Sequence, residues 1–347
     1  MKKNTLFKAL TIAISIAQTL LLSGCGLINK PFSITKNGLF FDTIVSITVI
    51  DDDSDKAEKA SKYSLELCEK YEKMFSATIP ESDIARINSS AGNTNEENII
   101  KISEETTQLL KKSIFYSELS DGEFDITIDP ISNLWDFHGD ENTAPKANQI
   151  NTALKHVDYH HIILERSNNK AYLNDKDASI EIGGIAKGYI ADKIADYLSE
   201  QGVTGALINM GGDIKVIGKN QNGVDFSIGI NDPSNTGTPL FPVYLSDYSI
   251  ATSGTYERSF TDSEGNFYHH ILNPKTGYPA ITDVTQASVL TRNSVDADAL
   301  ATICIIKGSR DALDFIEKLE DTEVILITTS GEVIKSSGIS QYLNNSQ

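Results

Sequence analysis

The sequence has 347 residues and a formal net charge of −18 at pH 7, with 48 acidic and 30 basic side chains. The length suits one large domain or two that pack closely together. The acidic balance argues against nucleic acid or an anionic lipid surface as the main partner, because like charges repel. Wherever a phosphate group binds, the negative charge of the protein must be offset locally, and a divalent cation would do so.

The chain begins with features typical of a secretory signal. Lys2, Lys3 and Lys8 precede a mostly apolar run at 9–22, which is too short for a comfortable membrane span. The run ends in Leu-Ser-Gly-Cys25, which is similar to a bacterial lipobox; a plain signal peptide with an incidental cysteine is the alternative. We expect residues 1–24 to be a lipoprotein signal peptide and Cys25 to carry the lipid. The protein would then be anchored at the extracytoplasmic face of the cell membrane by a tether at 25–37.

Apolar periodicity predicts helices and strands throughout the remaining chain. In chain order, we expect a β-rich stretch at 39–50, helices at 55–75, 103–120 and 147–154, a hairpin of 160–164 and 170–173, a strand at 179–182 that leads into a helix ending at Gly202, strands at 204–209, 214–217, 226–230, 243–245, 248–251 and 287–290, helices at 296–306 and 311–319, and a hairpin of 323–329 and 333–336. This pattern indicates an α+β fold with mixed or antiparallel sheets and flanking helices, in one compact body with two lobes.

A glycine pair separates the expected strand at 179–182 from the helix that follows it. Backbone N–H groups at Gly183 and Gly184 and the positive end of the helix dipole would attract an anion, and Lys187 adds a cation. The spacing matches neither a P-loop nor a dinucleotide-binding glycine motif. For this stretch alone, an ordinary strand-to-helix connection is the simpler interpretation.

Asp298 and Thr302 are four residues apart in the helix expected at 296–306, so their side chains share one face. A carboxylate beside a hydroxyl suits a hard cation that prefers oxygen ligands. The alternative is that acidic residues complement the helix dipole while Thr302 bonds to a backbone carbonyl. We favour that alternative for Asp296 but not for Asp298.

Two cysteines, Cys68 and Cys304, follow the expected signal. Both lie in expected helices, on or near apolar faces. Free buried thiols are therefore the favoured interpretation, since no spacing pattern supports a disulfide between them.

Eight stretches resemble the FAD:protein FMN transferase family, the ApbE-type flavin transferases, in the family's order and over nearly all of the mature chain. They are Phe41–Thr43, Phe75–Asn88, Asp121–Thr127, Glu181–Gly188, Asn209–Asp213, Thr252–Gly254, His270–Gly277 and Asp298–Thr302. The chain departs from the usual pattern at Phe41, where the family often has methionine, and at Glu181 and Asn273, where it often has aspartate. None of these three changes indicates a loss of function.

The resemblance implies that residues 38–347 are a flavin transferase domain. Its activity would be the Mg²⁺-dependent transfer of FMN from FAD to a serine or threonine hydroxyl of an acceptor protein, with release of AMP. The partners would be FAD and a membrane-associated acceptor flavoprotein. The lipoprotein-like start agrees with a family that works outside the cytoplasmic membrane.

The resemblance also implies a set of site residues. Mg²⁺ would be held by Asp298, Thr302 and the backbone carbonyl of Gly184, and the FAD diphosphate would lie near the glycine pair. Asp298 and His270 would be the catalytic residues. The FAD-binding residues would be Phe41, Ser76, Phe124, Asp125, Ile126, Glu181, Lys187, Gly254, His270 and Ile271.

His270 is the candidate general base for the attacking hydroxyl, and a structural histidine that hydrogen-bonds its own turn is an equal alternative. Two rival functions remain open. An FAD pyrophosphatase would use water as the nucleophile and release FMN and AMP. A flavin-binding lipoprotein would do no chemistry, although the Asp298 and Thr302 pair argues against it, because simple binding needs no dedicated cation site.

Overall fold

A computed structural model describes residues 30–93, 99–135, 137, 142–165 and 169–344. The main unit begins at Phe32. The expected signal peptide and Cys25 lie outside the described residues. In the described ranges, every helix is too short or too polar to cross a membrane.

The strands of the main unit are β1 (Phe32–Phe40), β2 (Thr43–Asp51), β3 (Ile100–Lys101), β4 (Ile162–Glu165), β5 (Lys170–Leu173), β6 (Gly205–Met210), β7 (Asp213–Gly218), β8 (Phe226–Asp232), β9 (Asn235–Leu245), β10 (Ser249–Gly254), β11 (Ser259–Thr261), β12 (Phe267–His269), β13 (Val284–Thr291), β14 (Glu323–Thr328) and β15 (Val333–Lys335). The α-helices are α2 (Ser54–Phe75), α3 (Asp83–Ser89), α4 (Glu104–Leu119), α5 (Asp129–Ser132), α6 (Ala147–Ala153), α7 (Ala186–Glu200), α8 (Ser294–Lys307), α9 (Ser309–Ile316) and α10 (Ser340–Leu343). Short 3₁₀ helices are η2 (Ile126–Ile128), η3 (Leu154–His156) and η4 (Tyr159–His161).

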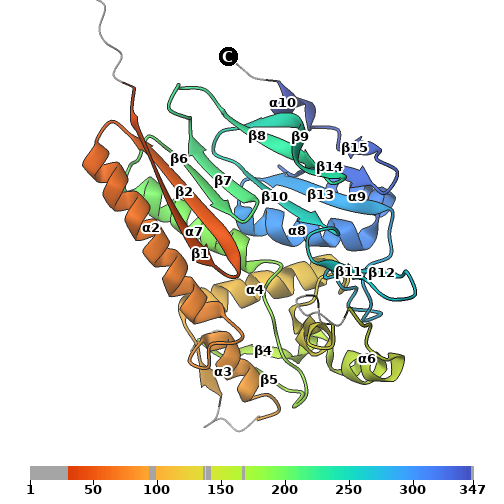
Figure 1. Ribbon diagram of the computed structural model, residues 1–347. Coiled ribbons are helices and arrows are strands. Elements are labelled where there is room, and N and C mark those ends of the chain that lie inside the picture. Colours follow the sequence, from red (N-terminus) through yellow and green to blue (C-terminus); the bar gives the residue numbers. More distant parts are fainter. Residues whose placement is uncertain (1–29, 94–98, 136, 138–141, 166–168, 345–347) are drawn as a thin grey trace, which may run out of the picture. The chain divides into compact units, whose positions relative to one another are not determined.

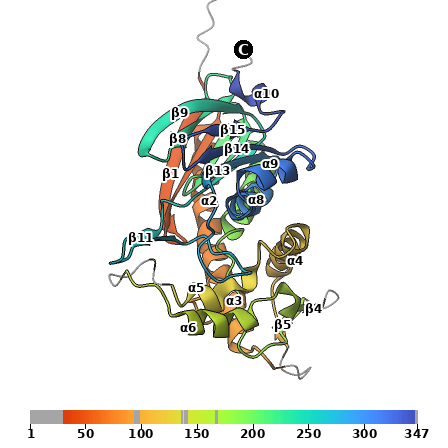
Figure 2. The same cartoon turned by 90° about the vertical axis from the view of Figure 1, so that its right-hand side faces the viewer.

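An eight-stranded sheet organises the main unit, with the strand order β1-β2-β6-β7-β10-β13-β14-β15. Its neighbouring strands pair antiparallel throughout. Helices α2, α7 and α8 pack against one face of this sheet (Figure 1). The hairpin β8–β9 lies on the opposite face, as the turned view in Figure 2 shows. The chain therefore has the expected α+β fold.

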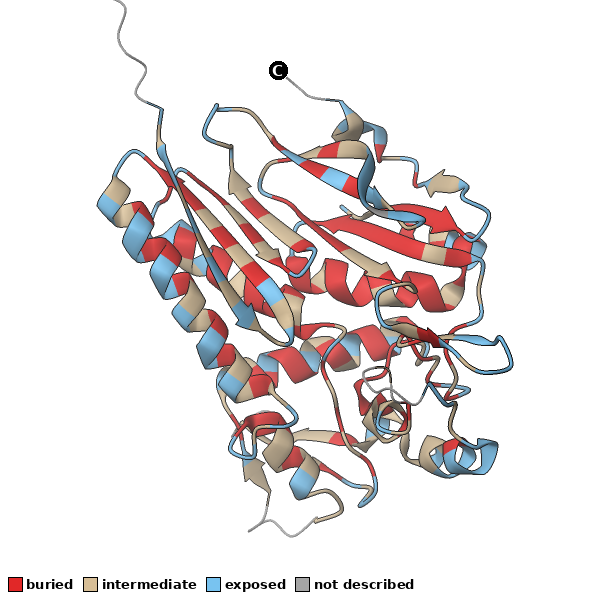
Figure 3. Ribbon diagram, viewed as in Figure 1, coloured by how far each residue is buried: buried red, intermediate tan, exposed pale blue. Residues whose placement is uncertain are grey.

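Burial follows the alternation of apolar residues along the strands, because successive side chains point to opposite faces of a sheet. In β8, Phe226, Ile228 and Ile230 are buried and the residues between them are exposed. In β13, which is covered on both faces, nearly every residue is buried. Figure 3 shows the buried residues concentrated along the central strands and α8. The candidate site residues on α8, Asp298 and Thr302, therefore stand on a well-packed support.

The smaller elements below the main sheet in Figure 1 include α3, α6 and a three-stranded antiparallel sheet of order β3-β5-β4. An apolar cluster around Trp135 joins α5 and α6 to the β11–β12 hairpin. The Trp135 indole N–H donates to the carbonyl of Gly277 over 3.0 Å. This contact fixes the loop after β12, in which the His270–Gly277 motif lies.

Three sequence expectations are corrected by these elements. Residues Phe32–Asn37 belong to β1 and pair with β2, so they are not part of a tether. Residues 179–182 form no strand. The side-chain amide of Asn88 hydrogen-bonds both the N–H and the carbonyl of Ile180, and the Glu181 N–H donates to the carbonyl of Ile126. The β11–β12 hairpin lies at 259–269, where no strand was expected.

Candidate active site

Helices α7 and α8 lie so close together that their contact requires a glycine, Gly188, on α7. A Cβ atom at Gly188 would lie only 2.3 Å from the backbone oxygen of Ser294. The carboxylate of Asp192 on α7 accepts the N–H groups of Ser294 and Val295 at the start of α8, over 2.8 and 2.9 Å. This close, capped junction fixes the side chains of α8 against the first turn of α7.

Asp298 is the buried carboxylate of this junction, with 4% of its surface exposed. Its Oδ2 accepts the backbone N–H of Gly188 over 2.9 Å, at the positive end of the α7 dipole. Burial raises the pKa of Asp298 to about 6, although Lys187 opposes the rise. The Gly188 N–H group in the first turn of α7 is thus used within the protein.

Lys187 lies between two buried carboxylates. Its Nζ is 2.6 Å from Asp213 Oδ2 and 3.3 Å from Asp298 Oδ1. Burial disfavours the charge of Lys187, but the two carboxylates outweigh burial and raise its pKa. Within the described residues, Asp213 Oδ2 has no hydrogen bond of good geometry, so its contact with Lys187 is an ion pair only.

Gly184 and Thr302, two of the three residues that the family resemblance assigns to a metal, lie close together in the structure. Thr302 lies one turn after Asp298 on α8, and its hydroxyl is 3.4 Å from that of Ser253 on β10. A Cβ atom on Gly184 would lie 3.5 Å from Thr302 Oγ1 and 3.2 Å from the ring of Phe124. Gly184 therefore lets the chain pass close to both side chains, and a larger residue would crowd them.

Glu181 forms a second acidic centre, just before the glycine pair. The Ser132 hydroxyl donates to its Oε1 over 2.9 Å. Burial raises the pKa of Glu181 to about 7, with a further rise from Asp129 and an opposing effect from Arg258. Near neutral pH, this side chain can therefore exchange a proton with a ligand or release it.

His270 follows β12 and is held by the carbonyl of Arg258. The His270 backbone N–H donates to that oxygen over 3.0 Å, and the ring Nδ1 lies 3.3 Å from it. Burial, with the positive charge of Arg258, lowers the pKa of His270 to about 4. With this pKa, the His270 ring is neutral at pH 7. A neutral ring that donates from Nδ1 has its lone pair on Nε2, where it can accept a proton.

A cleft of about 700 Å³ is lined by Asp42, Phe137, Glu257, Arg258 and Ser259. Its volume falls in the range of small-molecule sites, roughly 300–1,000 Å³. Arg258 affects the pKa values of both Glu181 and His270, and Lys187 affects that of Glu257. The residues lining the cleft are thus electrostatically coupled to the buried charges.

Five other residues that the family resemblance assigns to FAD binding contact neighbouring residues of the chain, outside the group around Lys187 and Asp298. Phe41 has a φ of 51° in the β1–β2 turn, and its N–H donates to Glu72. Ser76 follows α2 and contacts the Thr78 hydroxyl. Ile126 accepts the Glu181 N–H and Ile271 that of Ala280, while Gly254 ends β10 against the ring of Tyr256.

The Asp125 carboxylate already accepts three hydrogen bonds from within the protein. Its carboxylate accepts the N–H and hydroxyl of Thr127 over 2.8 and 2.6 Å, and the N–H of Tyr159 over 2.8 Å. Burial raises its pKa. The geometry is that of a structural carboxylate that ties η2 to η4, and its assignment to flavin binding stays a prediction.

Sequence reasoning gave too little weight to Asp213, Ser253 and Arg258. Asp213 follows a glycine pair at the β6–β7 turn, and the N–H of Thr252 on β10 donates to it over 3.1 Å. Its pairing with Lys187 depends on α7 packing against β7, which adjacency in sequence does not reveal. Arg258 lies between β10 and the unexpected β11 strand, so no motif pointed to it.

Comparison with known proteins places this site in a family. The model of the ApbE family matches residues 41–326. The FAD:protein FMN transferase of Treponema pallidum is 31% identical over 287 residues, which cover 79% of this chain and 78% of that protein. The FAD:protein FMN transferase of Vibrio cholerae is 27% identical over 338 residues, which cover 96% of each chain.

Solved structures agree with the sequence matches. The crystal structure of the ApbE protein from Thermotoga maritima has a TM-score of 0.81 and 27% identity, and covers 90% of this chain and all of that one. The flavin transferase ApbE from Vibrio cholerae has a TM-score of 0.79 and 25% identity, again over 90% of this chain and all of that one. The chain therefore belongs to the ApbE family of flavin transferases.

Proposed function

We propose that this protein transfers FMN from FAD to a serine or threonine hydroxyl of an acceptor protein, in a Mg²⁺-dependent reaction that releases AMP. The relatives are named FAD:protein FMN transferases, which supports flavin transfer. The observation that carries the finer proposal is the meeting of Lys187, Asp213, Asp298 and Thr302 at the start of α7. This arrangement combines cation ligands with an anion-attracting helix end.

The residues at this site fit a divalent cation. Asp213 and Asp298 are buried carboxylates that share one lysine, so they retain a net charge of −1 in their ionised forms. Burial raises the pKa of Asp298, and the neighbouring charge of Asp213 raises it further. Asp298, Thr302 and the backbone carbonyl of Gly184 would hold Mg²⁺ through the oxygen donors that it prefers. When bound, the ion would polarise the phosphorus and stabilise charge on the leaving AMP.

The protein's own side chains would bind and orient the reacting groups. The ammonium group of Lys187 now contacts the Asp298 carboxylate. Once a cation compensates Asp298, that ammonium group could contact a diphosphate oxygen instead. Arg258 lines the cleft and would add positive charge for the FAD phosphates. The acceptor hydroxyl oxygen would bond to the FMN phosphorus as the bond from that phosphorus to the AMP phosphate breaks.

His270 is our candidate for the proton acceptor in this step. The carbonyl of Arg258 orients its ring, which is neutral near pH 7. A pKa of about 4 makes the ring a weak base in the ligand-free protein. The negative FAD phosphates would raise that pKa toward neutrality, because a nearby opposite charge favours the protonated ring. His270 Nε2 would then take the hydroxyl proton as the new ester forms.

Incubation with FAD, Mg²⁺ and a serine- or threonine-containing acceptor tests this proposal. We expect covalent flavin fluorescence on the acceptor and release of one AMP for each FMN attached. An acceptor whose serine and threonine residues are replaced by alanine is the control, and it should gain no fluorescence. AMP and free FMN formed at the same rate without any acceptor would instead identify a pyrophosphatase.

We also propose that the protein acts at the extracytoplasmic face of the cell membrane, through a lipid on Cys25. The support is the basic start, the short apolar run and the Leu-Ser-Gly-Cys25 sequence. A membrane-associated flavoprotein would then be the natural acceptor. Mass spectrometry of membrane flavoproteins that are co-expressed with this chain should find the added FMN.

A further inference from the structure

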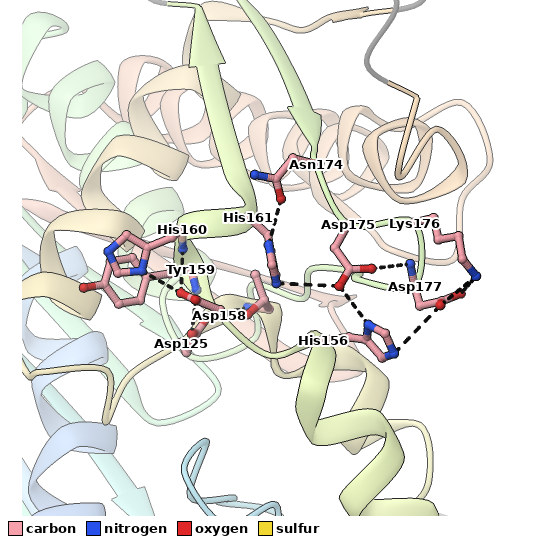
Figure 4. Close-up of polar contacts among 11 residues, drawn as sticks. Asp125, His156, Asp158, Tyr159, His160, His161, Asn174, Asp175, Lys176 and Asp177 are labelled. Carbon is pink, nitrogen blue, oxygen red and sulfur yellow. Dashed lines mark hydrogen bonds and ion pairs between the residues drawn. The ribbon is translucent and has the colours of Figure 1, made fainter.

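A group of histidines and aspartates lies apart from the residues proposed for FMN transfer. His156 ends η3, His161 ends η4, and Asp175 and Asp177 lie in the turn after β5 (Figure 4). Three short segments that are separate in the secondary structure thus bring imidazole and carboxylate groups together.

Both histidines approach the same oxygen of Asp175. His156 Nδ1 is 2.8 Å from Asp175 Oδ2, and His161 Nε2 is 3.7 Å from it. The other nitrogen of His156, Nε2, is 3.8 Å from Asp177 Oδ2. One ligand atom from each of His156, Asp175 and Asp177 can be chosen so that all three lie within 4.8 Å of one another.

The hydrogen bonds of these rings determine which nitrogens are free. His161 Nδ1 lies 2.7 Å from the amide oxygen of Asn174, so it donates its proton there and leaves a lone pair on Nε2. His156 Nδ1 lies 2.8 Å from Asp175 Oδ2, so these two atoms share either a proton or a bound cation. The lone pair on His161 Nε2 faces the same oxygen over 3.7 Å, so a cation placed there could bind all three atoms.

We propose that His156, Asp175 and Asp177 bind a divalent transition-metal ion of the zinc class, with His161 completing the ligand set. Bonds of about 2.1 Å in a tetrahedral site separate the ligand atoms by roughly 3.4 Å, so the contacts of Asp175 Oδ2 with His156 Nδ1 (2.8 Å) and His161 Nε2 (3.7 Å) need only small shifts. Imidazole with carboxylate favours such ions over Mg²⁺ or Ca²⁺, which prefer oxygen ligands alone.

The burial of the group suits a bound ion. The side chains of His156, His161 and Asp175 are 21–23% exposed, so they are partly shielded from water but can be reached by an ion. Lys176 contacts Asp177 over 2.8 Å, but its side chain is 77% exposed and can move into solvent. An ion would therefore displace a mobile ammonium group rather than a packed one.

A metal ion at this position would brace the segment from His156 to His161. That segment supplies the Tyr159 N–H to the buried Asp125. With Gly122 and Lys275, it also lines a second cleft of about 390 Å³. The ion would thus stabilise the wall of this cleft without taking part in FMN transfer.

The test uses the full chain without a histidine tag, stripped with a chelator and kept in excess Mg²⁺. Co²⁺ is added as a spectroscopic probe, and Zn²⁺ is then added to displace it. We expect one tightly bound Co²⁺ per chain, displaced by Zn²⁺, with a visible spectrum typical of nitrogen and oxygen ligands. The melting temperature should rise with added Zn²⁺.

Four variants locate the ion. His156→Ala and Asp175→Asn should each weaken Zn²⁺ binding by at least roughly tenfold. His160→Ala is the matched control, because that histidine is 71% exposed and contacts Asp158 rather than this group. Asp298→Ala should also retain the Zn²⁺ site, which separates it from the proposed Mg²⁺ site. Circular dichroism checks that each variant is folded.

Unchanged Zn²⁺ affinity in folded His156→Ala and Asp175→Asn would overturn the proposal and leave only an ion-paired cluster. An equal loss in His160→Ala would also contradict it, because the binding would then not depend on this particular geometry.

Discussion

Lys187, Asp213 and Asp298 form a buried charged group whose members depend on one another. Breaking such a group by removing one partner leaves an uncompensated buried charge, at a cost of roughly 3–5 kcal/mol. Lys187→Met should therefore lower the melting temperature of the metal-free protein, because both carboxylates lose their cation. Added Mg²⁺ should restore more stability to this variant than to the wild type. Equal thermal shifts with Mg²⁺ in the two proteins would mean that the ion binds elsewhere.

Glu181 gives the protein a specific dependence on pH. Its pKa rises from an ordinary value of 4.5 to about 7 in the folded protein, so the folded state holds its proton more tightly than the unfolded state. The contribution of Glu181 to stability is therefore greatest below pH 4.5 and is lost as the pH rises to 7. Glu181→Gln keeps the shape and an acceptor for Ser132 but cannot ionise.

Glu181→Gln should therefore be more stable than the wild type at pH 8, by about 1–3 kcal/mol, and nearly equal to it at pH 4.5. Thermal unfolding of the FAD-free proteins across this pH range measures the difference. A difference that stays constant with pH would show that Glu181 does not titrate as the geometry indicates.

The candidate site illustrates which residues a sequence can reveal. Asp298 and Thr302 were predicted to be neighbours, because helical spacing alone determines that relation. The approach of Gly184 to Thr302 was predicted only through family resemblance, and the pairing of Lys187 with Asp213 was missed. Those contacts arise where α7, β7 and β10 meet, and no local pattern in the sequence encodes that meeting.

At the scale of elements, the α7–α8 junction is the most demanding contact near the site. A methyl group on Gly188 would collide with backbone atoms of Ser294 and Val295, which cannot rotate away as a side chain does. Gly188→Ala should lower the free energy of unfolding by about 1–3 kcal/mol, despite the better helix propensity of alanine. It should also displace the N–H group that holds Asp298.

Gly183→Ala is the matched control, because a Cβ atom there meets no atom within 4 Å. Its free energy of unfolding in urea should stay close to the wild-type value. A similar loss in both variants would indicate a general sensitivity of this turn to side chains, and not a close contact between two helices.

The helices were predictable because their apolar spacing and caps are local signals. The helix expected at 103–120 forms as α4, and the hydroxyl of its cap residue Ser103 accepts the Thr106 N–H over 3.0 Å. Cys68 and Cys304 are free and buried in the described helices, as expected. Residues 179–182 misled the prediction because alternating burial does not require a pairing strand. Here the Asn88 side chain makes two hydrogen bonds to Ile180, and the Ile126 carbonyl accepts one from Glu181, so no neighbouring strand forms a ladder.

At the scale of the whole molecule, the α+β class followed from the mixture of periodicities, but the sheet order did not. Strands β2 and β6 are neighbours although more than 150 residues separate them in sequence. Such pairing depends on tertiary packing of both faces, by helices on one side and by β8–β9 on the other. The division into two lobes stays a prediction.

Anchoring is the second property of the whole molecule. Cys25→Ser removes the thiol that would receive the lipid, so the variant should leave the detergent phase and keep an unprocessed signal. Phase partitioning and the mass of the purified protein measure both effects. Cys68→Ser is a control that changes a buried thiol and should keep the lipid. Unaltered partitioning of Cys25→Ser would exclude a lipid anchor at this cysteine.

The most direct test of the central claim is FMN transfer to an acceptor peptide, with Mg²⁺ titrated for the wild type, Asp298→Ala and Asp296→Ala. Asp296 is the matched control, because it lies two residues away on α8 and contacts Tyr116 and Lys112 instead. We predict that Asp298→Ala loses nearly all transfer and its response to Mg²⁺, since a positioned metal supplies several kcal/mol of transition-state stabilisation. Asp296→Ala should keep both. Wild-type transfer by Asp298→Ala, with the same response to Mg²⁺, would contradict the proposed site and its mechanism.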